Sequence, residues 1–195
     1  LQGLDWKMLK EEYARFLPHI SNNYDFQELL SELLGELNAS HTGGRYSPNM
    51  QNPDATAALG LLYDETFNSK GIKVTEEIAG GPFDKSTSKL KAGFIIEKID
   101  GEEITNDVDW NKFLNRKSAK NTLISLFDPA TNSRFEEVVK PINFGEEAAL
   151  MYKRWIRKMD DMVNTLSDGK VGYVHVQGMN DGSYRNTFDA VMGKN

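Results

Sequence analysis

Apolar residues near the start of the chain recur every three or four positions, the spacing of one face of an α-helix. In residues 5–17 this stripe consists of Trp6, Leu9, Tyr13, Phe16 and Leu17, and Pro18 ends it. We expect a second helix to begin at Asp25, with Glu28 three residues later as a capping-box partner. Its apolar positions are Phe26, Leu29, Leu30, Leu33, Leu34 and Leu37. Helices this short are not stable alone, so both must pack on something.

The pattern changes in residues 57–143, where apolar positions alternate or run continuously as in β-strands. Four stretches have this character, namely "GIKVTEEIA", "GFIIEKIDGEEI", "TLISLFD" and "RFEEVVKPI". Turn-forming pairs such as Asp100-Gly101 and Asp128-Pro129 separate them, and "DVDWNKFLNRK" has helical spacing. Residues 47–56 contain two prolines and are expected to be a linker. We therefore predict a compact barrel of short strands with one or two helices.

Helical spacing returns after this segment and runs from Glu146 to Leu166. The basic residues Lys153, Arg154, Arg157 and Lys158 lie mostly off the apolar stripe, and we expect them to face solvent. Asp168-Gly169 should close the helix. The next stretch, "KVGYVHVQGM", is apolar on both faces and predicts a buried strand of a mixed sheet, followed by a short helix in "SYRNTFDAVM".

One strand between helices cannot form a sheet by itself. We infer that the first and last segments belong to one larger α/β domain, interrupted by the barrel. The predicted fold class is α+β, with boundaries at 1–50, 57–143 and 144–195.

Composition excludes several classes of function. The 195 residues carry a formal net charge of −6, which disfavours nucleic-acid binding because phosphates require a basic face. No apolar run approaches the roughly 20 residues that span a bilayer. The absence of cysteine excludes disulfides, thiolate metal sites and a cysteine nucleophile. The three histidines have no metal-binding spacing, so we expect neither a metal nor a cofactor.

The candidate chemistry lies in "ELNASHTGG", where a helical pattern gives way to glycines at Ser40 and His41. A histidine suits a general base near neutral pH, and a position just past a rigid helix would hold it firmly. The alternative is a helix C-terminus, where a partly charged imidazole is stabilised by the helix dipole. Spacing alone favours this alternative. His175 is expected to be a hydrogen-bonded core residue, and Ser183 a helix N-cap.

Several stretches, which together cover nearly the whole chain in the family's order, resemble the tricorn-like proteases of the tail-specific, C-terminal-processing serine peptidase family. In this family a PDZ domain lies between two parts of the catalytic core. "GPFDKSTSKLKAGFIIEKIDGEEI" is similar to the PDZ signature, and "ALGLLYDE" is similar to the PDZ loop and strand that receive a peptide carboxylate. "ELNASHTGG" and "LMYKRWIRKMDDMVNTLSDGKVGYVHVQGM" are similar to the peptidase core.

The resemblance implies a serine peptidase that hydrolyses peptide bonds in peptides or unfolded proteins, with His41 as the general base and Ser40 orienting it. The family's nucleophilic serine and a further glutamate would follow the "GYVHV" strand by tens of residues, beyond Asn195. The sequence looks cut from a longer chain, and we expect this piece alone to be inactive. Family members are often exported, while tricorn itself is intracellular. We favour an exported, periplasmic location and leave oligomerisation open.

The resemblance also implies a peptide-binding loop made of Leu59, Gly60, Leu61 and Leu62. A bound peptide would add a strand through main-chain hydrogen bonds. The sequence departs from the PDZ pattern twice, because "GLGF" appears as "LGLLYD" and an acid common after the second turn is absent at Gly93-Phe94. One alternative is that Gly60 only starts a strand in a domain that binds no peptide. Another is a non-catalytic PDZ scaffold in place of an enzyme.

Overall fold

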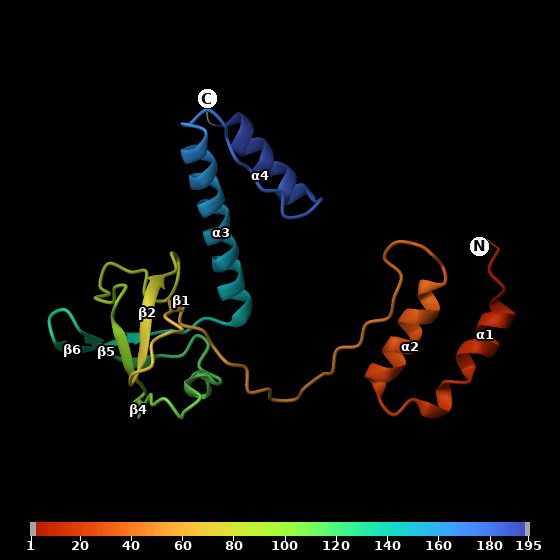
Figure 1. Cartoon of the computed structure of the whole chain (residues 1–195), viewed down its shortest axis with the longest axis horizontal. Helices are drawn as coiled ribbons and strands as arrows, with labels where there is room; N and C mark the ends of the chain where they lie inside the picture. Colours follow the sequence, from red (N-terminus) through yellow and green to blue (C-terminus); the bar gives the residue numbers. More distant parts are fainter. Residues whose placement is uncertain (1–2, 194–195) are drawn as a thin grey trace. The chain divides into compact units, whose positions relative to one another are not determined.

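The computed structural model describes residues 3–193, which divide into two compact units (Figure 1). One unit ends at Pro53 and the other begins at Asp54. The first is helical, drawn in red to orange, and the second contains a β-sheet and two further helices, drawn in yellow to blue. The mixed α and β character expected from the sequence is confirmed. Among the helices within residues 3–193, none combines the length and apolarity needed to cross a membrane.

The first unit is a helical hairpin. It consists of α1 (Trp6–Ala14), the 3-10 helix η1 (Leu17–His19) and α2 (Asn23–Gly35). Pro18 stands in η1, so the first helical run ends before it, as its lack of an N–H and its fixed φ angle require. The side chain of Asp5 caps α1 by accepting the N–H groups of Lys7 and Met8, at 3.0 and 3.1 Å.

The second helix begins at Asn23, two residues before the predicted Asp25, and its N-cap is Asn22. The Asn22 side-chain oxygen accepts the N–H groups of Tyr24 and Asp25, at 2.8 and 3.0 Å. The Asp25 carboxylate turns back and accepts the N–H of Ser21 at 3.0 Å. Both residue types are good N-caps, so composition alone does not decide between them.

The second unit contains six strands in one antiparallel sheet. They are β1 (Leu61–Tyr63), β2 (Ile72–Glu77), β3 (Ile95–Ile99), β4 (Glu102–Glu103), β5 (Thr122–Asp128) and β6 (Ser133–Val139). The order across the sheet is β1-β2-β3-β5-β6, and β4 pairs with β3. Asp100 and Gly101, both with positive φ, form the tight turn between β3 and β4 that the sequence predicts.

The prediction of a compact barrel needs correction, because this sheet is open and does not close into a barrel. Ala58, before β1, meets Ile142, after β6, in a single isolated antiparallel bridge. The residue before Ile142 is the buried Pro141, which has no N–H to extend a ladder. The two end strands β1 and β6 therefore stay unpaired with each other.

A tight apolar core lies inside the curled sheet. Residues from every long strand contribute to it, and Val74, Ile96, Ile99, Ile124 and Leu126 are fully buried. The stretch "DVDWNKFLNRK" forms a 3-10 helix, η2 (Trp110–Leu114), whose last residue inserts into the same core.

Two helices follow the sheet. Helix α3 (Phe144–Leu166) begins with a complete capping box between Asn143 and Glu146, and Asp168-Gly169, both at positive φ, follow its end. Helix α4 (Asp181–Met192) is capped by Asn180, whose side chain accepts the Ser183 N–H at 2.9 Å. The prediction that Ser183 is the cap is therefore wrong by three residues.

The strand predicted in residues 170–179 is absent. A strand needs a neighbour to accept and donate its backbone hydrogen bonds, and residues 3–193 supply none beside this stretch. Val171 and Val176 accordingly stay exposed. His175 is exposed rather than in a core, but it does form the expected hydrogen bond, between its Nδ1 and Tyr152 Oη at 2.6 Å. Its ring also packs on Trp155, with centroids 4.8 Å apart.

Candidate functional site

Ser40 and His41 lie in a turn beyond the end of α2. His41 has a φ of 63° and Asn38 a φ of 44°, both in the left-handed region that non-glycine residues seldom adopt. Five residues, 36–40, separate His41 from Gly35, the last residue of α2. A helix dipole acts within its last turn, so it gives no reason for a histidine at this distance.

The chain after His41 is attached to α2. The Ser31 hydroxyl donates to the Gly44 carbonyl at 3.1 Å and accepts the Gly44 N–H at 2.9 Å. The Gln27 side-chain oxygen accepts the Tyr46 N–H at 3.3 Å. A Cβ on Gly44 would lie 3.2 Å from the Gln27 carbonyl oxygen, so a glycine permits this close approach. Gly44, the last glycine of "SHTGG", therefore allows the segment after His41 to run back alongside α2.

The side chains of Ser40 and His41 are both exposed. Within residues 3–193 neither makes a side-chain hydrogen bond, and none joins the two. Across the same turn, the Thr42 hydroxyl donates to the Ala39 carbonyl at 2.9 Å. The turn thus presents the imidazole to solvent.

The predicted peptide-binding loop lies where the chain enters β1. Leu59 and Leu61 are buried in the core of the sheet unit, while Leu62 is half-buried. Gly60 has a φ of 66°, and a Cβ there would lie 2.8 Å from Pro82 Cδ. Only glycine fits this position without strain.

A cavity of about 310 Å³ adjoins this loop and β1. It is lined by Thr56, Ala57, Ala58, Leu59, Tyr63, Trp110, Asn111, Leu114, Phe144 and Glu147. The strand β1 pairs with β2 on one side and with no strand of residues 3–193 on the other. The ring of Tyr63 meets that of Trp110 edge to face, with centroids 5.3 Å apart. Burial of Tyr63, and secondarily the Glu147 charge, raise the pKa of its hydroxyl.

One face of α3 contacts the loops around β1 and β2. Along this face lie Glu147, Leu150, Arg154 and Lys158, at helical spacing. Arg154 forms a two-pronged ion pair with Glu76 of β2, and the Lys158 Nζ lies 3.8 Å from the same carboxylate. This hydrogen bonding by Arg154 lowers the pKa of Glu76. The expectation that these basic residues face solvent is therefore wrong for Arg154, whose side chain is 18% exposed, whereas Lys158 stays exposed.

Glu147 extends this contact to the start of β1. Burial raises the pKa of its carboxyl group, and a hydrogen bond from the Gly60 N–H opposes that rise. Sequence reasoning missed Glu147 because Gly60 and Tyr63, with which its carboxyl group interacts, are more than 80 positions away in the chain, and no local pattern marks the contact.

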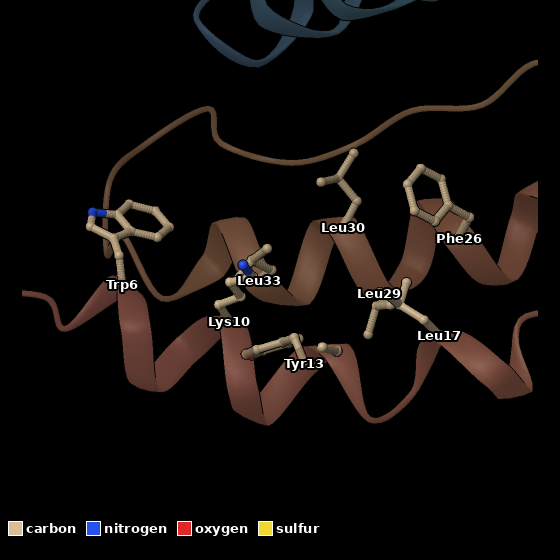
Figure 2. A pocket seen from close by; sticks show the side chains of 9 residues that line it. Trp6, Lys10, Tyr13, Leu17, Phe26, Leu29, Leu30 and Leu33 are labelled. Atoms are coloured by element: carbon tan, nitrogen blue, oxygen red, sulfur yellow. The ribbon is translucent and has the colours of Figure 1, made fainter.

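The helical hairpin has a cavity of its own, also about 310 Å³ (Figure 2). Its lining comes from both helices and η1 and consists of Trp6, Lys10, Tyr13, Ala14, Leu17, Phe26, Leu29, Leu30 and Leu33. Of these side chains, Lys10 alone is charged. Within residues 3–193 there is no group of three or more histidine, aspartate or glutamate residues that could hold a metal ion.

Comparison with known sequences finds tricorn-type proteins. The profile of the tricorn protease C1 domain family matches residues 1–35. The tricorn-like protease C-terminal subunit of Sulfurisphaera tokodaii is 26% identical over 184 residues, which cover 90% of this chain and 21% of the relative. A tricorn protease homolog of Saccharolobus solfataricus is 24% identical over 184 residues, covering 90% and 17%. The chain thus spans about a fifth of the length of these relatives.

Comparison with solved structures agrees for the fold. A crystal structure of the tricorn protease matches with a TM-score of 0.77 and 18% identity, over 92% of this chain and 18% of that one. The photosystem II D1 C-terminal processing protease matches with a TM-score of 0.36, which is too low to indicate a common fold. The resemblance to the tricorn-like proteases that the sequence motifs indicate is therefore confirmed, both by relatives aligned along most of the chain and by the shared fold.

Proposed function

We propose that this chain is part of a tricorn-like serine peptidase in which His41 is the general base and Ser40 helps to orient it. The observation that carries the proposal is the alignment of 90% of the chain with relatives named as tricorn-type proteases. The exposed position of the imidazole supports it, because a general base must reach the group that it deprotonates.

In the proposed reaction, His41 takes the proton of a serine hydroxyl as that oxygen attacks a peptide carbonyl. It then gives the proton to the leaving amine, and water hydrolyses the acyl-enzyme with the same residue as base. The nucleophilic serine would come from sequence that follows Asn195 in the parent protein. We therefore propose that the 195 residues alone have no peptidase activity.

The sheet unit is proposed to be a PDZ domain that binds peptide C-termini. The open edge of β1 supports this, because a peptide could pair there as an added strand. Its terminal carboxylate would then lie at the loop from Leu59 to Leu62, and its last side chain in the adjoining cavity. The same observation also favours a second candidate function, a peptide-binding scaffold without catalysis. Peptides or unfolded proteins as ligands, and an exported location, stay predictions from the resemblance.

A serine-directed phosphonate probe on the full-length parent tests the proposal. We expect mass spectrometry to find the label on a serine outside the 195 residues, and to find it strongly reduced in His41→Ala. His19→Ala is the matched control, because His19 is another exposed histidine of the helical unit, and it should label normally. No label in well-folded wild-type protein would favour the non-catalytic scaffold.

A further inference from the structure

The first turn of α3 brings a carboxylate to the loop expected to receive a peptide carboxylate. The Glu147 side chain is half-buried and lines the same cavity as Leu59, Tyr63 and Leu114. The Gly60 N–H interacts with this carboxylate and opposes the rise of its pKa that burial causes. No backbone carbonyl of residues 3–193 accepts this N–H. Chemically, the side chain of a glutamate and the C-terminus of a peptide present the same group.

The position of Glu147 is set by contacts on both sides of it. The capping box uses Asn143 and Glu146, with bonds of 2.8 and 2.9 Å, and so fixes where α3 begins. Further along the same face, Leu150 packs so close to Gly80 that a Cβ there would lie 3.0 Å from Leu150 Cδ2. One turn later, Arg154 pairs with Glu76.

Electrostatics make this carboxylate an easily exchanged ligand. Neither Arg154 nor Lys158 is paired with Glu147, because both contact Glu76. The carboxylate is partly desolvated, and no cation of residues 3–193 forms an ion pair with it. A peptide C-terminus would present a free carboxylate to the loop and also form main-chain hydrogen bonds along β1. It would therefore make more hydrogen bonds there than Glu147 makes.

From these contacts we propose that Glu147 is an internal ligand of the peptide groove, which a peptide C-terminus must displace together with the first turn of α3. The inference rests on the proposed PDZ function of the sheet unit. It goes beyond that function because it makes peptide binding and the docking of α3 mutually exclusive. Phe144, which lines the same cavity and is 78% exposed, would move with Glu147.

The test is peptide binding by the 195-residue chain and its variants. The probe is a fluorescein-labelled heptapeptide that ends in Ala-Val with a free carboxylate, and its amidated form is the negative probe. Glu147→Ala removes the internal carboxylate and keeps a good helix former. Asp161→Ala is the control, since it removes an exposed carboxylate from the same helix far from the cavity. Glu147→Gln keeps the volume and removes only the charge.

We expect Glu147→Ala to bind the free-carboxylate peptide about tenfold more tightly than wild type, as loss of one charge-assisted competitor implies. Glu147→Gln should be intermediate, Asp161→Ala should match wild type, and the amidated peptide should bind none of them. In an NMR spectrum, the Gly60 amide should shift in Glu147→Ala and return toward its original position when acetate is added.

Other outcomes would overturn the inference, and they separate it from the proposed function. If wild type and Glu147→Ala bind the peptide equally, the groove stands and Glu147 is not its competitor. If no variant binds peptide and acetate leaves the Gly60 amide unmoved, the loop accepts no external carboxylate, and both the inference and the PDZ proposal fail. The peptidase role of His41 is then still decided by the phosphonate experiment alone.

Discussion

The helical hairpin and the sheet unit differ in how fully they bury their apolar side chains. In the sheet unit, fourteen buried residues form one core cluster. In the hairpin, Leu9 is the one buried apolar residue among those described up to Pro53. Trp6, Phe16, Leu17 and Phe26 are each more than 40% exposed there. The difference suggests that the sheet unit carries the stability of this chain, while the hairpin presents an apolar face and the candidate base.

The largest expected difference between the two units is in the cost of truncating one apolar side chain to alanine in each. We expect Ile124→Ala, in the sheet core, to lower the free energy of unfolding by about 2–5 kcal/mol because it leaves a cavity. Leu29→Ala, in the half-buried hairpin cavity, should cost about 1 kcal/mol or less, since the residue is already partly hydrated. Urea denaturation followed by circular dichroism measures both. Equal costs would show that the hairpin contributes as much as the sheet.

A second test concerns the backbone at the start of β1. We expect Gly60→Ala to destabilise the sheet unit by about 2–3 kcal/mol, because it combines a positive φ with a clash against Pro82. Gly93→Ala is the matched control, since Gly93 also has positive φ but has open space around it, and its cost should be about 1–2 kcal/mol. Thermal unfolding compares the two. A Gly60→Ala chain as stable as Gly93→Ala would mean that Pro82 moves aside at little cost.

The elements that the sequence predicts well are those with a strong local period. The apolar spacing of α3 and the alternation in "TLISLFD" each depend on residues within one element, and both appear where expected. Helix ends are less predictable, because Asn22 and Asp25 are both suitable N-caps. The backbone conformation at Asn22 is what places its side chain, and not that of Asp25, at the first N–H groups of the helix.

The failures share a physical cause, which is dependence on distant residues. The stretch 170–179 has the composition of a strand, but a strand exists only beside a partner. Closure of the barrel likewise requires pairing between segments far apart in the chain. The residues Ala58 and Ile142 form only a single isolated bridge there. In the candidate site, the Ser40-His41 motif could be found locally, whereas the approach of Glu147 to Gly60 follows only from the folded sheet.

A third test sharpens the role of α3 by removing its ion pair with β2. Arg154 holds the pKa of Glu76 below its ordinary value of 4.5, so the ionised carboxylate is favoured in the folded chain. The pair therefore stabilises the docked helix above about that pH, and its contribution is lost as pH falls through the lowered pKa. Because both side chains are partly exposed, we expect no more than about 1 kcal/mol from it.

The Arg154 Nε–H resonance, followed by NMR during an acid titration, reports this pair directly. It should shift as Glu76 is protonated in wild type and stay nearly constant in Glu76→Gln. Glu102→Gln, at an exposed residue of β4, should titrate like wild type. A titration that persists in Glu76→Gln would assign the pH response to another carboxylate.

The last test concerns the hairpin, where the turn that contains His41 is attached to α2. Ser31→Ala removes both hydrogen bonds to Gly44, so the returning segment should loosen at a cost of about 1 kcal/mol. Hydrogen exchange of the Gly44 amide should quicken several-fold, while Ser21→Ala, at an exposed serine before α2, leaves it unchanged. If the amide exchanges at the wild-type rate in Ser31→Ala, other contacts hold the segment. A loosened turn should also lower kcat of the parent peptidase more than it raises KM, because a general base must be held at its nucleophile and takes little part in binding.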